Sequence, residues 1–77
     1  MRIDAKWEQD GEARTGALVG LDDAGRYMLE SDAGSTALEA EDALDARLQL
    51  RPAAGATWVA FDDPDVDAYV RGPRTSH

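Results

Sequence analysis

The densest group of potential ligands in this sequence is the stretch FDDPDVD at residues 61–67, which places four aspartates around one proline. Counted from Asp63, aspartates at alternate positions reproduce the D-x-D-x-D start of an EF-hand calcium loop. That loop also requires glycine at its sixth position and glutamate at its twelfth, and here Ala68 and Arg74 occupy them. The stretch therefore predicts no EF-hand, and we expect neither a metal site nor a cofactor. A weak divalent-cation-binding module built from these carboxylates stays open as an alternative.

The same stretch is first explained as the beginning of a helix over residues 62–72. Asp63 suits the N-cap position, and Pro64 suits the first helical position. Aspartates in the first turn lie at the positive end of the helix dipole. An apolar stripe at helical spacing follows, consisting of Val66, Tyr69 and Val70. A helix that begins in this way still displays its outward carboxylates to a partner.

No set of residues in the chain predicts catalysis. Carboxylates that act as general acid and base need unlike environments, one of them buried, and nothing in the pattern predicts burial of an acid. The chain has no cysteine, and its only histidine is the last residue, His77. The glycines of GALVG at residues 16–20 fit neither a phosphate-binding loop nor a dinucleotide-binding fingerprint. We therefore predict a protein that is not an enzyme and has no catalytic residues.

Negative charge dominates the composition. The chain has 16 acids against 8 Lys and Arg, which gives a formal net charge of −8. Such a surface repels nucleic-acid phosphates and anionic membranes, so we expect direct contact with neither. A partner of complementary charge would be a basic protein surface. The alternative is an accessory subunit or domain from a high-GC or salt-adapted organism, in which the charge serves solvation.

The residues expected to contact a basic partner form two acidic groups, the second with an aromatic residue beside it. The first group is Glu39, Glu41, Asp42 and Asp45, and the second is Asp62, Asp63, Asp65, Asp67 and Tyr69. A small acidic protein without catalytic residues needs only shape and charge to occupy a phosphate-binding groove. The sequence therefore favours a stoichiometric inhibitor or DNA mimic of a nucleic-acid enzyme, of the anti-restriction or anti-CRISPR type.

The elements that position these groups are predicted from glycine-bearing turns. The turns are QDG at 9–11, DDAG at 22–25, SDAG at 31–34 and PAAG at 52–55. Alternating patterns between such closely spaced turns are typical of antiparallel sheets. They predict strands over 2–8, 13–21, 26–31 and 56–61. In the second of these, strict alternation places Gly16, Leu18 and Gly20 on one face, where another backbone could approach closely.

Residues 35–51 carry competing signals. A capping box at Thr36 and Glu39, followed by strong helix formers, favours a helix. On a helical wheel, however, Leu38 falls on the acidic side. We favour strands over 36–40 and 46–51, joined by a corner at EDALD. The second strand would then carry Ala46, Leu48 and Leu50 on one face.

Together these elements predict a mostly β protein, with a small antiparallel barrel-like or curved sheet of 5–6 strands and a short C-terminal helix. The alternative is an α+β fold in which residues 36–51 form a helix on a four-stranded sheet. We expect one domain over residues 1–72 and a frayed tail over 73–77. The absence of cysteine and of an apolar N-terminal segment favours the cytoplasm. The oligomeric state stays open.

Overall fold

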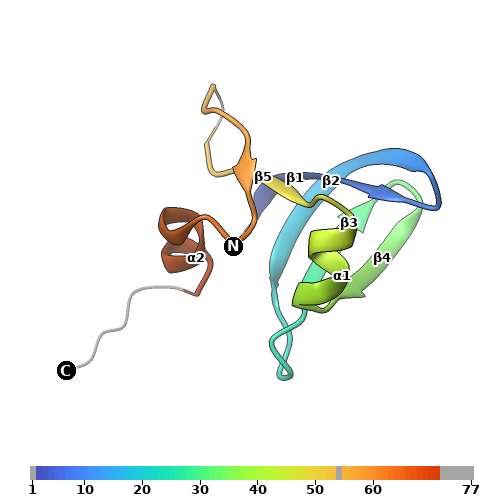
Figure 1. Cartoon of the computed structure of the whole chain (residues 1–77), viewed down its shortest axis with the longest axis horizontal. Coiled ribbons are helices and arrows are strands. Elements are labelled where there is room, and N and C mark those ends of the chain that lie inside the picture. The colour runs from blue at the N-terminus through green and yellow to red at the C-terminus, as the bar shows by residue number, and fades with distance from the viewer. Residues whose placement is uncertain (1, 54, 72–77) are drawn as a thin grey trace.

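The chain folds into an antiparallel sheet of six strands in the order β4-β3-β2-β1-β5-β6, accompanied by two short helices (Figure 1). The computed structural model describes residues 2–53 and 55–71. Across those residues the sheet stays open, because β4 and β6 form its two edges. The prediction of a mostly β, curved antiparallel sheet is confirmed. The predicted tail over 73–77 lies outside the described residues.

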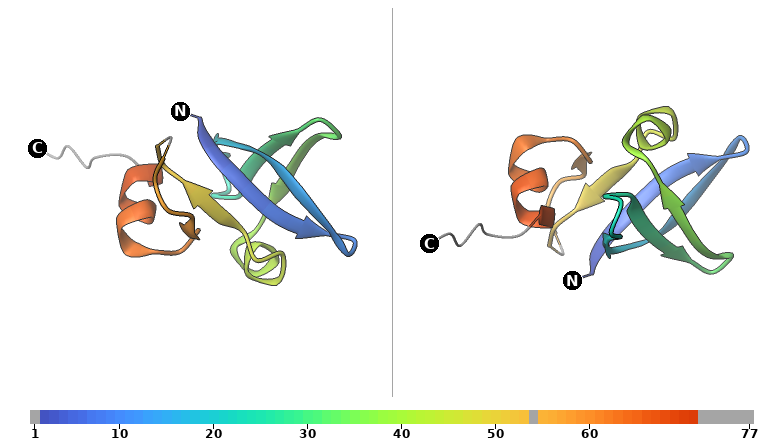
Figure 2. Two further views of the ribbon diagram at one scale, coloured as in Figure 1. Left: turned by 90° about the horizontal axis from the view of Figure 1, so that it is seen from above. Right: turned by 90° about the horizontal axis from the view of Figure 1, so that it is seen from below.

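The first four strands form a meander, and the fifth strand returns to the other side of the first. The strands are β1 (Ile3–Gln9), β2 (Glu12–Leu21), β3 (Tyr27–Ser31), β4 (Gly34–Leu38), β5 (Gln49–Arg51) and β6 (Val59–Ala60). The helices are α1 (Ala40–Asp45), between β4 and β5, and α2 (Pro64–Arg71), after β6. Figure 2 shows that β5 runs between the two helices, so that α1 and α2 lie at separate places on the molecule.

Strand β1 is central to the core because its alternate side chains are apolar. Ile3, Ala5 and Trp7 are all buried. The strand pairs with β2 along one edge and with β5 along the other. The alternation predicted for this segment is therefore confirmed, and it fixes which side of the sheet faces the core.

Strand β2 contains an irregularity that simple alternation does not predict. The register between β2 and β3 shifts between Leu18 and Gly20. Leu18 is fully buried, and beyond the shift Leu21 also packs against the core. Strict alternation places these two leucines on opposite faces, but an extra residue in one strand reverses the alternation after it. The single-face pattern predicted over 13–21 is thus corrected.

Gly16 is the position in β2 where backbones approach closely. A β-carbon at Gly16 would lie 1.8 Å from the carbonyl oxygen of Glu30. Gly16 pairs with Ala5 of β1 and with Ser31 of β3, so it lies in the middle of three strands. At Gly20 a β-carbon would meet no atom within 4 Å. The predicted close approach is therefore confirmed at Gly16 and wrong at Gly20.

Residues 35–51 are divided among three elements. Strand β4 ends at Leu38, which pairs with Tyr27, and β5 begins at Gln49. A helix over 36–51 is therefore wrong, because pairing with β3 outweighs local helix propensity as far as Leu38. The corner at EDALD is also not a simple corner, since it forms most of α1. Glu39 is the N-cap of α1 without a side-chain cap hydrogen bond, so the predicted capping box is absent.

The predicted strands on either side of Pro52 are shorter than expected. Strand β5 begins at Gln49 instead of residue 46, and β6 covers only residues 59–60 of the predicted 56–61. The first begins late because the chain is still leaving α1 at its cap, Ala46. The second ends at residue 60, where the chain turns toward α2, and residues 56–58 form no strand. The predicted face is nevertheless confirmed. Leu48 and Leu50 are buried, and Ala46 packs against the core.

The end of α1 is closed by a pair of backbone hydrogen bonds. The N–H of Leu48 donates to the carbonyl of Ala43 at 3.0 Å, and the N–H of Arg47 donates to the carbonyl of Leu44 at 3.1 Å. This is the Schellman pattern, in which the residue after the cap adopts a left-handed conformation and is usually glycine. Here that residue is Arg47, with φ of 55°.

The helix predicted after residue 62 is confirmed together with its cap. Asp63 Oδ1 accepts the N–H of Asp65 at 2.9 Å, and Pro64 is the first helical residue. Residue 72 lies outside the described residues, so the predicted C-terminal boundary is not compared. The proline has no N–H to leave unsatisfied, and the aspartate satisfies the next one, which explains why α2 begins here.

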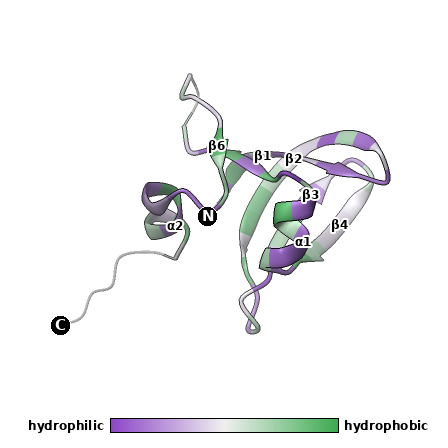
Figure 3. Cartoon of the chain, in the orientation of Figure 1, coloured by the Kyte–Doolittle hydropathy of each residue, from purple (hydrophilic) through white to green (hydrophobic). Residues whose placement is uncertain are grey.

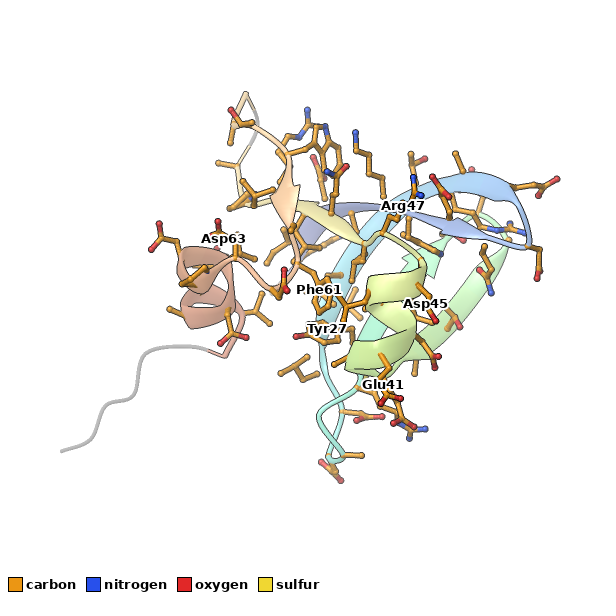
Figure 4. The ribbon with its side chains drawn as sticks, viewed as in Figure 1. Tyr27, Glu41, Asp45, Arg47, Phe61 and Asp63 are labelled. Carbon is orange, nitrogen blue, oxygen red and sulfur yellow. The ribbon has the colours of Figure 1, made fainter. Side chains whose placement is uncertain are left out.

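Helix α2 is attached to the sheet through apolar side chains. Val66 and Val70 are buried, whereas Tyr69, predicted for the same stripe, is 57% exposed. Phe61, just before the helix, meets Tyr27 of β3 edge-on, with ring centroids 5.1 Å apart (Figure 4). Fully burying an aliphatic or aromatic side chain contributes about 1.5–3 kcal/mol, so these contacts outweigh the weak propensity of so short a helix.

The hydropathy of the residues also differs between the sheet and the helices. In Figure 3 the apolar colour runs along the second half of β2, while both helices carry polar and apolar bands. Neither helix has the length and apolar character needed to cross a bilayer, as judged over residues 2–53 and 55–71.

Candidate protein-binding surface

The first acidic group lies on α1 and its N-cap. Glu39 precedes the helix, and Glu41, Asp42 and Asp45 lie within it. All four side chains are exposed. Figure 4 shows Glu41 and Asp45 on the side of α1 away from Phe61. No basic residue occupies the last turn, so Asp45 lies at the negative end of the helix, where a carboxylate is disfavoured.

The second acidic group lies at the start of α2, and its members differ in environment. Asp62 and Asp65 are exposed, whereas Asp63 and Asp67 are half-buried. The carboxylate of Asp63 caps the helix, so this residue has a structural role whatever else it contacts. Tyr69 follows on α2 and is largely exposed. The second predicted group therefore contains Asp63, which is needed for the fold, and at least three residues with exposed side chains, namely Asp62, Asp65 and Tyr69.

A shallow apolar cleft lies between α1 and the turn that leads to α2. Its volume is about 170 Å³, and its lining includes the buried residues Ala43, Leu48 and Phe61. Leu44 of α1 and Asp62 also line it. Leu44 is 59% exposed, which is unusual for a leucine beside a core. The cleft thus joins the two segments that carry the acidic groups, and sequence reasoning assigned no role to Leu44.

Ion pairs in the described part of the chain lie on the sheet and its turns. They join Arg2 to Glu30 at 3.0 Å, Arg14 to Glu12 at 3.5 Å, Arg26 to Asp22 at 2.8 Å and Arg51 to Asp4 at 2.7 Å. No described residue forms an ion pair or a side-chain hydrogen bond with the first acidic group. Exposed pairs contribute only about 0–1 kcal/mol each, but they neutralise charge locally.

The net charge of the chain is therefore segregated. Residues 39–45 and 62–67 hold eight of the sixteen acids and no Lys or Arg. The rest of the chain has the other eight acids and all eight cations, and is formally neutral. The two helical segments thus carry the whole net charge of −8. This partition can be read from the sequence when charged residues are counted segment by segment, but the net charge of the whole chain does not reveal it.

The acids of the described residues do not converge. Over residues 2–53 and 55–71, no three Asp, Glu or His side chains are grouped so that they could hold a metal ion. His77 lies outside those residues. The N–H of Arg26, the Arg26 guanidinium and the N–H of Ala24 lower the pKa of the Asp22 carboxyl, with partial desolvation opposing them.

No protein-family model matches the chain, and comparisons with curated proteins and with solved structures gave no significant match. The surfaces described above therefore carry the functional inference by themselves.

Proposed function

We propose that this protein is a non-catalytic binding protein whose acidic face docks on a basic surface of another protein. The term acidic face denotes two separate segments, residues 39–45 of α1 and its cap and residues 62–67, which lie on either side of the cleft lined by Leu44 and Asp62. The supporting observation is that these two segments hold eight acids and no Lys or Arg, whereas the rest of the chain is formally neutral. Acid enrichment that serves only solvation or follows codon usage does not predict such a partition.

The acidic face also carries apolar anchors. Leu44 and Tyr69 are 59% and 57% exposed, and each is attached to one of the two acidic segments. Interfaces are commonly stabilised by a few apolar or aromatic side chains inside a polar rim. The surrounding carboxylates would accelerate association with a basic partner and make it sensitive to salt.

The more specific form of this proposal is a stoichiometric inhibitor of a nucleic-acid enzyme, acting as a DNA mimic of the anti-restriction or anti-CRISPR type. A groove that binds phosphates is among the most basic surfaces that proteins present. The carboxylates of α1, which form no ion pair with a described residue, are suited to such a groove. A partner of this kind and a chain without cysteine both point to the cytoplasm.

Two variants with the same change in charge test the proposal. The first neutralises the α1 segment of the acidic face through Glu39→Gln, Glu41→Gln, Asp42→Asn and Asp45→Asn. The control neutralises four acids elsewhere through Glu8→Gln, Asp10→Asn, Asp23→Asn and Asp32→Asn. Immobilised wild type and control should retain the same basic protein from a lysate at low salt, and the first variant should lose at least about tenfold in affinity for it. Circular dichroism checks that all three proteins are folded.

Duplex DNA added to the captured complex tests the more specific form. If the partner is held through its phosphate-binding groove, DNA should release it in a concentration-dependent manner. A complex that holds DNA and this protein together would rule out the DNA mimic, while docking on a basic surface would stand. Equal losses of affinity in the two variants, or no basic protein retained, would contradict the proposal as a whole.

A further inference from the structure

We propose that the free edge of β4 binds an extended segment of a basic protein as an additional strand of the sheet. Strand β4 forms one edge of the sheet, and no strand among the described residues pairs with its outer side. The backbone N–H and C=O groups along such an edge can pair with another chain. The edge adjoins the acidic face at Glu39, but the proposal stands even if that face binds no protein.

Strand β4 lacks the features that usually protect an edge strand. Natural edges are shortened, charged, interrupted by proline or distorted by a bulge. Strand β4 has five residues, GSTAL, with neither charge nor proline, and its pairing with β3 has no register shift. Figure 3 shows most of it in the pale colour of intermediate hydropathy. The opposite edge, β6, has only two residues, so it offers much less backbone to a partner.

The register of the β3–β4 hairpin identifies the backbone groups that point away from the sheet. Ser31 pairs with Gly34 across a two-residue turn, and a turn of this length usually closes with a hydrogen bond between its first and last residues. Hydrogen-bonded and non-hydrogen-bonded pairs then alternate along antiparallel strands. The N–H and C=O groups of Ser35 and Ala37 therefore point outward, and both residues are exposed.

A shallow apolar pocket lies beside this edge on the outer face of the sheet. Its volume is about 330 Å³, and Val19, Met28 and Ala37 contribute to its lining. Met28 is 36% exposed and pairs with Ala37, so both side chains lie on the face opposite to buried Leu29. Alternate side chains of an added strand would lie on the same face and contact Met28, whose flexible thioether adapts to different apolar groups.

The charges at the two ends of β4 indicate the chemistry of the added segment. Asp32 lies in the turn before the strand, and Glu39 follows it directly. Both are exposed, and neither forms an ion pair with a described residue. The acids that line the pocket, in contrast, are paired with arginines of this chain. A segment with an uncharged, β-forming middle and Lys or Arg at both ends therefore matches the edge.

A second copy of this chain matches the same edge less well. In an antiparallel pair of β4 strands, the Asp32 end of one copy would lie beside the Glu39 end of the other. In a parallel pair, each of these acids would lie beside its own equivalent. Both arrangements bring carboxylates together, and each copy has a formal net charge of −8. Charge therefore favours a basic segment over self-association.

A blocked synthetic peptide can represent the added segment. It has alternating Val and Thr at five positions, which matches the length of β4, and a Lys-Arg pair at each end. In NMR titration of the full chain, amide signals of residues 34–38 should shift and saturate. A peptide with Glu in place of each Lys and Arg should bind at least about tenfold more weakly.

Methylated peptides test whether the backbone of the peptide is recognised. In two further peptides, the backbone nitrogens of the middle segment are methylated at odd or at even positions. Methylation at one set of positions should abolish binding, whereas methylation at the other set should be tolerated, because only one edge of the added strand faces β4. This comparison uses the unmodified protein, so it does not depend on the folding of any variant.

The decisive variant is Ala37→Pro, with Ala37→Thr as its matched control. Proline removes an outward N–H and is accepted in edge strands whose N–H groups face solvent, so the variant should stay folded by circular dichroism. Its affinity for the basic peptide should fall at least about tenfold. Threonine keeps the N–H and favours strands, so the control should bind the peptide like the wild type.

Several results would overturn the proposal. They are the absence of a saturable shift, shifts confined to α1 and α2, equal binding of the Glu peptide or of the two methylated peptides, and unchanged affinity in Ala37→Pro. Dimerisation of the wild type in light scattering that Ala37→Pro abolishes would also overturn it, because the edge would then bind a second copy. None of these results bears on the acidic face, whose test is retention of a basic protein from a lysate.

Discussion

Gly16 is the residue at which the sheet should tolerate a side chain least. A β-carbon there would overlap the carbonyl oxygen of Glu30, which belongs to a paired backbone and cannot rotate away. We predict that Gly16→Ala lowers the free energy of unfolding by at least about 2 kcal/mol, because β2 and β3 must separate to accept it. Urea unfolding measures the change.

Gly20→Ala is the matched comparison for that prediction. The same strand has open space around Gly20, so an alanine there is disfavoured only by the left-handed φ of 149°. It should therefore destabilise the protein less than Gly16→Ala. If the two substitutions have equal effects, close approach of the strands is not what selects glycine at position 16.

Asp22 makes the stability of the turn before β3 dependent on pH. Its pKa is below the usual value of 3.8, chiefly because its carboxylate accepts the N–H of Arg26. A pKa that is lower in the folded than in the unfolded state stabilises the fold above the unfolded value, and this contribution is lost as the pH falls through the folded value. The stabilisation should thus be present at neutral pH and disappear below about pH 4.

Asp22→Asn tests this dependence. The variant should be less stable than the wild type at neutral pH, and the difference should narrow in urea unfolding curves recorded between about pH 5 and pH 2. Asp23→Asn, at the exposed neighbouring position, provides the control and should follow the wild type. A constant difference across the whole range would show that the Asp22 carboxylate does not titrate as its hydrogen bonds indicate.

At the scale of elements, α2 depends on a cap that also belongs to the acidic face. Asp63 accepts the N–H of Asp65, and buried Val66 and Val70 attach the helix to the core. Asp63→Ala should cost about 1 kcal/mol of stability, whereas Asp63→Asn should cost only a few tenths, because asparagine also caps helices. Thermal unfolding measures both.

The same pair of variants separates structure from recognition. Asp63→Asn removes the charge and keeps the cap, so weaker binding of the basic partner by this variant would assign Asp63 a direct contact. If Asp63→Asn is as unstable as Asp63→Ala, the charge of the residue and not its cap hydrogen bond stabilises α2.

Element prediction succeeded where local chemistry and tertiary contacts agree. The start of α2 was predicted because Asp63 and Pro64 specify it through their own side chains. Residues 35–51 were only partly predicted, because Leu38 is held in β4 by pairing with β3 and not by its own propensity. The apolar cleft between α1 and the turn to α2 was missed because Leu44 and Asp62 are distant in sequence and share no motif.

At the scale of the whole molecule, segregation of charge predicts how stability depends on salt. Repulsion among the carboxylates of α1 should be relieved as KCl increases, so the melting temperature should rise between about 0.05 and 1 M. Neutralising Glu39, Glu41, Asp42 and Asp45 should remove most of that rise. The control variant with Glu8, Asp10, Asp23 and Asp32 neutralised should retain most of it. If the melting temperatures of the two variants rise equally with KCl, the result would favour the alternative in which negative charge serves solvation over the whole surface.

The sequence by itself determined the class of fold, the cap of α2 and the total charge, because alternation, turn residues and side-chain caps act over a few neighbouring positions. Only the tertiary structure decided that Leu21 joins the core, that Gly16 accommodates a neighbouring strand and that Leu44 is exposed. These properties depend on the register between strands and on which elements meet, and such contacts between distant residues are not encoded by any local pattern.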